Sequence, residues 1–180
     1  MIESLCVLLK TVMNRKGRSF VSLQEEIRCV DAYLDIARQR FGEGLFVTKD
    51  VDADLLQYPV PNFILQPIVE NAVEHGGTRK GKTRIGIRAY RTDSGDLVLE
   101  IEDDGRLTDI GREKIKAILE DNADAGQNGE SLPAEARREL GLRNVNRRLK
   151  ILCGSDSGIS LESGEDGCTI FRIRIVKACS

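Results

Sequence analysis

The chain has 180 residues, of which 41% are hydrophobic and 31% charged, and its formal net charge is −2. This size and composition fit one compact domain and exclude a disordered chain or a strongly basic protein that binds nucleic acid through its charge. Tryptophan is absent and only three Tyr and five Phe occur, which also disfavours stacking on nucleic-acid bases.

The cysteines and the hydropathy pattern favour a reducing, cytoplasmic environment. The five cysteines are an odd number without Cys-x-x-Cys spacing, which fits neither a disulfide framework nor a zinc site. The sequence has no run of about eighteen apolar residues, so it predicts no transmembrane helix.

Two helices are predicted before residue 45. Residues 2–13 carry apolar side chains at helical spacing, and charged residues and a glycine at 14–19 interrupt the pattern. Ser22 and Glu25 have the spacing of a capping box, which predicts a second helix that ends at Gly42. Its apolar residues recur every four and three positions: Leu23, Ile27, Val30, Leu34, Ala37 and Phe41. This seam fits a partner helix or packing within the chain, and its short length favours packing within the chain.

Four stretches are predicted to be strands: 45–51, 83–91, 97–102 and 171–175. In the last of them, apolar Phe171, Ile173 and Ile175 alternate with two arginines. Such alternation belongs to a sheet with one covered face, so helices must pack on that face. The predicted fold class is therefore α/β, a two-layer sandwich of a mixed β-sheet covered on one face by helices.

A long segment, 106–139, separates the third predicted strand from the last helix. A short helix is predicted at 109–120, and a further helix is expected to start at 133–138 and to continue through 142–152. Between them, residues 121–131 are rich in Asp, Asn, Gly and Gln and have no core pattern. A connection of this length in a compact domain is functional or disordered, and we expect a mobile lid.

The helix predicted within 61–77 has one apolar and one polar face. Glu70, Asn71, Glu74 and His75 fall on the polar side, one turn apart in pairs. An Asn oxygen can hold Mg²⁺ beside substrate phosphates, and a neighbouring Glu can take or position a proton. Taken alone, the segment fits an ordinary solvent-exposed helix face better than a site.

Two shorter motifs have chemistry that suits a nucleotide. Asp103 and Gly105 follow a predicted strand, where a carboxylate can accept a hydrogen bond from an exocyclic amine and a glycine lets a ring approach the backbone. Gly141 and Leu142 are expected to open a helix, whose free N–H groups would bind phosphate. The alternatives are an ordinary acidic turn and a simple helix cap.

Four stretches, taken in their order, resemble LytS-like (autolysin-sensor type) sensor histidine kinases. They are LQEEIRCVDAYLDIARQRF, LQPIVENAVEHG, EDDG and LGLRNVNRRL, and together they span most of the chain. ENAVEHG resembles the N box of the ATPase superfamily that these kinases share with gyrase and the MutL proteins. The resemblance implies the histidine-kinase ATPase (Bergerat) fold preceded by N-terminal helices, with ATP and Mg²⁺ as ligands.

The resemblance also implies a role for each site residue. Glu70 would be catalytic and polarise the acceptor histidine, while Asn71 would bind Mg²⁺. Asp103 and Gly105 would contact adenine, and Thr169 would line the same pocket. The phosphates would lie near His75 and receive backbone N–H groups from Gly141 and Leu142.

Four positions depart from the family pattern. Glu74 stands where the family often has Lys, and Leu107 replaces the second glycine of Asp-x-Gly-x-Gly. Glu139 replaces the first glycine of Gly-x-Gly-Leu, and Cys168 stands at the position of a late Thr. A carboxylate near phosphates is unfavourable unless it turns away, so Glu74 and Glu139 are expected to weaken ATP binding if they face the phosphates.

The acceptor histidine of such a kinase is expected outside this sequence. His75, the one histidine, belongs to the N box, and no Pro-His-Phe box occurs. Residues 1–42 would then be the remnant of a dimerisation hairpin with its connecting helix, and residues 43–180 the catalytic domain.

The expected function is transfer of the ATP γ-phosphoryl group to that histidine, in the cytoplasmic part of a membrane sensor. The expected protein partners are the acceptor-histidine domain, a response regulator and a second copy of the full-length chain. Two alternatives stay open: a degenerate dimeric regulatory module that binds nucleotide weakly, and an anti-sigma-type serine kinase of the same superfamily.

Overall fold

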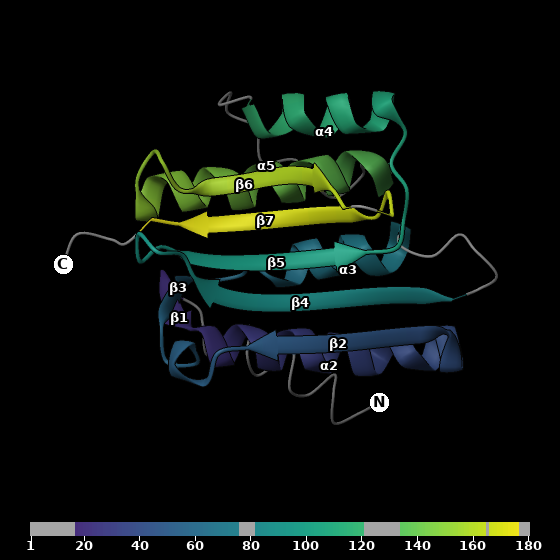
Figure 1. The fold of residues 1–180 in the computed structure, drawn as a ribbon, viewed down its shortest axis with the longest axis horizontal. Helices are drawn as coiled ribbons and strands as arrows, with labels where there is room; N and C mark the ends of the chain where they lie inside the picture. The colour runs from purple at the N-terminus through teal and green to yellow at the C-terminus, as the bar shows by residue number, and fades with distance from the viewer. Residues whose placement is uncertain (1–16, 76–81, 121–133, 165, 177–180) are drawn as a thin grey trace.

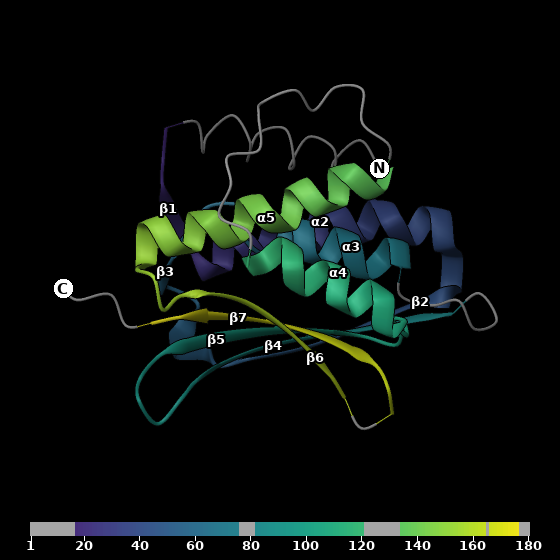
Figure 2. The same cartoon turned by 90° about the horizontal axis from the view of Figure 1, so that it is seen from above.

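The computed structural model describes residues 17–75, 82–120, 134–164 and 166–176. A five-stranded sheet forms one layer, and the helices all lie on one of its faces (Figures 1 and 2). The strand order is β2-β4-β5-β7-β6, with β2 at Leu45–Val51, β4 at Thr83–Arg91, β5 at Leu97–Asp103, β6 at Gly158–Ser163 and β7 at Thr169–Ile175. The β2–β4 pair is parallel and the other pairs are antiparallel. The predicted sandwich with a mixed sheet is confirmed.

The covering layer contains α2 (Leu23–Phe41), α3 (Gln66–His75), α4 (Asp109–Glu120) and α5 (Ala134–Cys153). Two 3₁₀ turns, Gly42–Gly44 and Ala53–Leu55, flank β2, and a small sheet pairs β1 (Phe20–Ser22) with β3 (Pro59–Pro61). None of the described helices is both long and apolar enough to cross a bilayer. The helix predicted at 2–13 and the central part of the expected lid, 121–131, lie outside the described residues.

The capping box predicted for α2 is present. The Ser22 hydroxyl accepts the N–H of Glu25 at 3.2 Å, and the Glu25 carboxylate accepts the N–H of Ser22 at 3.0 Å. Gly42 ends the helix with a φ of +58°, a conformation that favours glycine. Leu23, Val30 and Leu34 are buried in the same core as α3. The apolar seam of α2 therefore packs within the chain, as expected.

The core lies between the helices and the sheet, and α3 is at its centre. Its stripe of Ile68, Val69 and Ala72 is fully buried. Facing it are the covered-face residues of the middle strands, among them Ile85, Ile87, Leu99, Ile101, Phe171 and Ile173. Each fully buried aliphatic side chain contributes roughly 1.5–3 kcal/mol, so this packing fixes α3 against the sheet.

Gly141 and Leu142 do not open a helix, contrary to expectation. They lie in the interior of α5, which begins at Ala134, within the helix start predicted at 133–138. Residues 134–140 read AEARREL, a run of strong helix formers directly after Pro133, a residue common at helix starts. Those propensities extend the helix past the glycine, so the N–H groups of Gly141 and Leu142 belong to a continuous helix.

A buried asparagine joins α5 to its two neighbours. Asn146 donates its Nδ2 to the carbonyl oxygen of Leu119 at 2.6 Å, and its Oδ1 accepts the N–H of Ile159 at 2.8 Å. A Cβ added at Gly158 would stand only 2.8 Å from the same Oδ1, so the close approach requires glycine there. The end of α4 and the start of β6 are thereby fixed to α5.

Candidate functional site

A small cavity lies where α3, β5 and β7 meet, and it has a volume of about 30 Å³. It is lined by Asn71, Asp103, Gly105, Arg106, Leu107, Thr169 and Phe171. Asp103 and Thr169 are direct partners across the β5–β7 pair, which places them side by side. Four residues that the sequence analysis selected, Asn71, Asp103, Gly105 and Thr169, therefore meet at one place.

Asn71 presents a polar atom that the described residues leave unsatisfied. Its side chain is 6% exposed, and its Oδ1 is buried without a hydrogen-bond partner among the described residues. Leaving a buried acceptor unpaired costs about 1–3 kcal/mol, so a ligand that binds this oxygen would recover that energy. An amide oxygen is a hard donor that suits Mg²⁺.

The described residues fit a metal ion that is shared with a bound ligand, rather than one surrounded by protein side chains. In the part of the chain that the structure describes, no three His, Cys, Asp or Glu side chains gather around one point. A cation at Asn71 would therefore take most of its ligands from bound phosphates and water, as Mg²⁺ does in nucleotide sites. The residues present fit Mg²⁺ bound together with a nucleotide.

Asp103 and Thr169 hold the loop at Gly105 from two sides. Oδ1 of Asp103 accepts the N–H of Gly105 at 2.8 Å, and the Thr169 hydroxyl donates to the carbonyl oxygen of Gly105 at 2.8 Å. Asp103 is only 5% exposed, so a carboxylate stands at the cavity wall in a position fixed by the loop. This wall can accept a hydrogen bond from an exocyclic amine.

Glu70 lies on a different side of α3 and does not line this cavity. Its Oε1 accepts a hydrogen bond from Nε2 of Gln66 at 2.8 Å. Burial raises the pKa of Glu70, the hydrogen bond from Gln66 opposes that rise, and the nearby charge of Glu74 adds to it. A carboxyl group with a raised pKa beside α2 can hold or move a proton more readily than an ordinary surface glutamate.

Leu142 does not line this cavity, and the side chain of His75 cannot be placed relative to it. His75 ends α3, and its side chain lies outside the described residues. Leu142 is buried and lines a neighbouring cavity of about 160 Å³ together with Leu107, Gly111, Lys114, Ile115, Ile118 and Glu139. Leu107 thus lines both cavities.

Glu139 turns toward α4. Its carboxylate oxygen is 2.6 Å from Nζ of Lys114, an opposite charge that explains its direction. The Glu139 carboxylate therefore turns away from the cavity of Asn71 and Asp103, which is one of the two orientations that the sequence analysis left open. Glu74, the other unexpected carboxylate, is exposed on α3.

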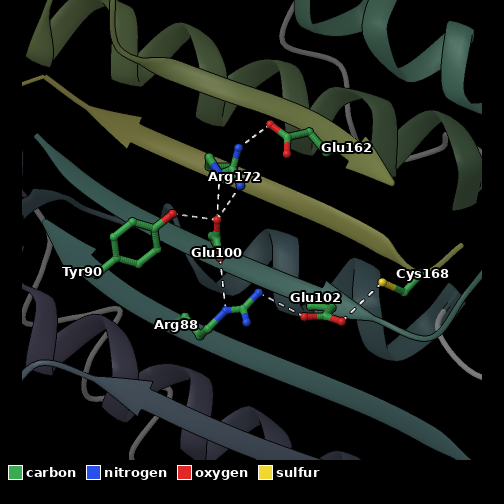
Figure 3. Close-up of polar contacts among 7 residues, drawn as sticks. All are labelled: Arg88, Tyr90, Glu100, Glu102, Glu162, Cys168 and Arg172. Atoms are coloured by element: carbon green, nitrogen blue, oxygen red, sulfur yellow. Dashed lines mark hydrogen bonds and ion pairs between the residues drawn. The ribbon is translucent and has the colours of Figure 1, made fainter. Parts of the chain in front are cut away.

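Cys168 faces the uncovered side of the sheet (Figure 3). Its Sγ donates to Oε1 of Glu102 at 3.3 Å, whereas the next residue, Thr169, points into the cavity. Successive residues of an extended chain point to opposite faces, which explains the difference. The side chain of Cys168 therefore does not line the cavity, and Thr169 lines it instead.

The uncovered face carries an ion network around Glu100 (Figure 3). Arg88 and Arg172 approach its carboxylate at 3.1 Å and 2.7 Å, and the Tyr90 hydroxyl donates to it at 2.8 Å. Burial alone would raise the pKa of Glu100, but the hydrogen bonds and the two positive charges together hold the pKa below its ordinary value. This network stands on the opposite face of the sheet from the Asn71 cavity.

A buried charged residue next to the start of α3 was missed by the sequence analysis. Glu26 of α2 is fully buried, and its carboxylate accepts three backbone N–H groups of the turn that leads into α3. The sequence held a signal for it, because position 26 falls on the helical stripe of Leu23, Val30 and Leu34. A glutamate within an apolar stripe must be paired inside the fold.

Comparison with known proteins identifies the family. The family described as Histidine kinase-, DNA gyrase B-, and HSP90-like ATPase matches residues 61–178, and a histidine kinase family matches residues 1–45. The chain belongs to this family of ATPases. The resemblance to LytS-like sensor histidine kinases is confirmed, and the chain corresponds to their ATP-binding catalytic part.

Named relatives are about one third identical to this ATPase domain. Sensor histidine kinase BtsS of Escherichia coli is 33% identical over 162 residues, which cover 89% of this chain and 25% of BtsS. Sensor protein LytS of Staphylococcus saprophyticus is 31% identical over 155 residues, covering 83% of this chain and 24% of LytS. The chain thus spans about a quarter of the length of these relatives.

Solved structures support the fold. The catalytic domain of histidine kinase ThkA aligns with a TM-score of 0.58 at 16% identity, covering 88% of this chain and 94% of that domain. Full-length ShkA, in complex with AMPPNP, aligns with a TM-score of 0.61 at 14% identity, covering 99% of this chain and 35% of ShkA. At such identities the likeness is one of fold, and the fold is that of histidine-kinase ATPase domains.

Proposed function

We propose that this chain binds ATP with Mg²⁺ and transfers the γ-phosphoryl group to a histidine outside the sequence. One observation carries the proposal: Oδ1 of Asn71 is buried without a hydrogen-bond partner among the described residues, in the cavity that also contains Asp103 and Thr169. These groups suit the metal–phosphate end and the adenine end of one nucleotide. The related ShkA binds AMPPNP, an ATP analogue, which supports ATP as the ligand.

In this proposal each side chain acts mainly by position. Asn71 would hold Mg²⁺, and Asp103 with Gly105 would accept the adenine amine beside Thr169. When bound, Mg²⁺ would supply charge neutralisation, the main requirement of phosphoryl transfer besides alignment. Glu70, whose pKa burial raises, would polarise an acceptor histidine that approaches its side of α3.

Two roles require a change from the described structure. Gly141 and Leu142 can offer backbone N–H groups to phosphate only if α5 unwinds as far as residue 141 when the nucleotide binds. His75, at the end of α3, would then lie near the same phosphates. The cavity also has to open, because about 30 Å³ holds roughly one water molecule.

The proposed partners and location are supported by the family. We propose an acceptor-histidine domain and a response regulator as protein partners, dimerisation of the full-length protein, and a cytoplasmic position in a membrane sensor. The histidine kinase match at residues 1–45 and the names of the sensor relatives support this.

Calorimetric titration with ATP tests the proposal, with and without Mg²⁺. Asp103→Asn should weaken ATP binding by about 1–2 kcal/mol, since the amide keeps an acceptor oxygen but loses its charge. Asp104→Asn is the matched control, because Asp104 is exposed and accepts the N–H of Arg84 outside the cavity. Asn71→Ala should abolish the Mg²⁺-dependent part of the affinity. An unaltered chain that binds neither ATP nor ATP·Mg²⁺ would refute the proposal.

A weakly binding regulatory module is the second candidate, and Leu107 favours it. This side chain stands where the family has glycine and lines the small cavity. That candidate predicts weak ATP binding without Mg²⁺ dependence, so the same titration separates the two.

A further inference from the structure

A buried carboxylate of α2 holds the turn before α3. Oε1 of Glu26 accepts the N–H of Phe63 at 2.9 Å, and its Oε2 accepts the N–H groups of Ile64 and Leu65, each at 3.0 Å. Hydrogen bonds to an ionised carboxylate are shorter and stronger than those between neutral groups. The N-terminal end of a helix also favours a negative charge, since the peptide dipoles leave partial positive charge there.

The turn that receives this carboxylate has an unusual backbone. Phe63 has a φ of +58°, the one positive φ of a non-glycine residue among those described. A side chain on Cβ makes this conformation unfavourable, so it persists where the surroundings fix it. The preceding residue, Asn62, donates its N–H to the carbonyl oxygen of Ser19 at 3.0 Å and accepts a hydrogen bond from Arg148 of α5. Glu26 is therefore one of the restraints on this turn, and its charged side chain is fully buried.

The turn and Asn71 belong to one rigid piece. The carbonyl oxygen of Leu65 accepts the N–H groups of Ile68 at 3.1 Å and Val69 at 3.0 Å, which are the first hydrogen bonds of α3. Asn71 follows in the next turn of the same short helix. Any tilt at the start of α3 would therefore displace Oδ1 of Asn71 within its cavity.

A second residue of α2, Tyr33, is partly buried against the core that α2 shares with α3. Burial raises the pKa of Tyr33 to about 12, and the negative charges of Glu70 and Glu74 add to the rise. Tyr33 and Glu26 are seven residues apart, two turns of helix, so they lie on the same side of α2. The same side of α2 thus meets α3 both at its beginning and beside Glu70.

We infer that Glu26 is a positioning residue of the nucleotide site, whose carboxylate fixes the start of α3 and thereby places Asn71 in the cavity. The link to Mg²⁺ and ATP rests on the proposed function, whereas the contact itself does not. Asp103 and Thr169 belong to β5 and β7 rather than to α3. Loss of the Glu26 carboxylate should therefore impair the metal–phosphate end of the site and spare the adenine end.

The test compares Glu26→Gln with the unaltered chain in titrations with ATP·Mg²⁺ and with adenosine. A glutamine places an NH₂ group against backbone donors and removes the charge, so the turn must rearrange. Because a displaced Asn71 would lose its interaction with the bound cation, we expect ATP·Mg²⁺ affinity to fall about tenfold or more. Adenosine affinity should change less than about twofold, because changes at separate sites act almost independently.

Neighbouring variants provide the controls. Glu25→Gln leaves a capping box intact, because glutamine serves at that position as well as glutamate does, so both affinities should match those of the unaltered chain. Glu26→Asp keeps the charge but shortens the side chain by one methylene, so its loss of ATP·Mg²⁺ affinity should be intermediate. If Glu26→Gln does not fold, the same comparison is made with Glu26→Asp.

A second measurement separates this inference from the proposed function. The side-chain amide NMR signal of Asn71, recorded without nucleotide, should shift in Glu26→Gln and stay in place in Glu25→Gln. If the unaltered chain binds no nucleotide, the proposed function fails and this signal alone decides the positioning role. An unmoved Asn71 signal, or an equal loss of ATP·Mg²⁺ and adenosine affinity, would overturn the inference.

Discussion

Leu107 is the family departure that stands directly in the cavity, and removing its side chain should improve nucleotide binding. The side chain is partly buried and packs against the core while it lines both cavities. The cavity of about 30 Å³ between Asp103 and Asn71 is far smaller than an ordinary ligand pocket, so its lining must move before adenine can enter, and Leu107 is part of that lining.

The expected gain in affinity can be derived from the burial that the Leu107 side chain loses when it moves. Full burial of a leucine side chain is worth roughly 1.5–3 kcal/mol, so moving a partly buried one costs about 1 kcal/mol. A binding-competent state that costs about 1 kcal/mol lowers the apparent affinity about fivefold. Leu107→Ala removes most of this cost, so ATP·Mg²⁺ and adenosine should each bind about fivefold more tightly. The free energy of unfolding should fall by about 1 kcal/mol, since the same contacts are lost.

Calorimetry with both ligands, together with urea denaturation, measures these changes. Ile118→Val is the matched control, because buried Ile118 lines the neighbouring cavity without lining the one at Asp103. It should cost a similar 0.5–1.5 kcal/mol of stability, about as much as Leu107→Ala, and leave both affinities unchanged. Folded Leu107→Ala protein whose affinity is equal or weaker would refute the reasoning that Leu107 blocks the site.

Three further predictions concern pH and glycine. The pKa of Glu70 is raised, mainly by burial, so ionisation of this side chain destabilises the fold as pH rises through that pKa. Glu70→Gln should therefore raise the unfolding temperature at neutral pH. Below about pH 4.3 it should not, because the side chain is protonated in the unfolded chain too. Gly141→Ala has open space and should stabilise α5 by about 0.5–1 kcal/mol in urea denaturation, while ATP affinity falls if α5 must unwind there; unchanged affinity would argue against that phosphate contact. Gly158→Ala should lower the free energy of unfolding in urea by about 1–3 kcal/mol, because its Cβ would collide with Asn146. Gly86→Ala is the control and should not lower it, because its Cβ would meet no atom nearer than 3.7 Å. Equal losses in the two variants would contradict the Asn146 restraint.

The elements predicted correctly are those with a strong local pattern. The capping box of Ser22 and the regular seam of α2 carry their own signal, as does the alternation in β7. The small sheet and β6 were missed because pairing, rather than sequence, makes them strands. β3 contains Pro59 and Pro61, which argue against a strand, yet it pairs with β1. β6 is a short edge strand with a single partner, β7, and its alternation is limited to two apolar residues, Ile159 and Leu161.

The site residues also divide into those with a local sequence signal and those without one. Asn71, Asp103 and Thr169 were found from motifs, and the structure brings them together. The helix start expected at Gly141 was wrong because a glycine motif was weighted above the helix formers that precede it. The apolar stripe of α2 signals that Glu26 is buried, but its partners, the backbone N–H groups of residues 63–65, are a long-range contact that no local pattern encodes.

The structure also changes which family departures bear on function. Cys168 faces Glu102 on the uncovered face, and Glu139 pairs with Lys114, so neither side chain enters the cavity of Asn71 and Asp103.

Of the two carboxylates that could repel ATP, only Glu74 therefore remains, because Glu139 is paired. Glu74 is exposed, so water and salt screen its charge. What remains is a steric argument: the Leu107 side chain lines the cavity of the proposed nucleotide site. A steric block reduces affinity for ATP and adenosine alike, whereas misplaced charge would act on ATP alone. The ratio of the two affinities therefore shows which cause limits nucleotide binding, and the structure predicts that the steric one does.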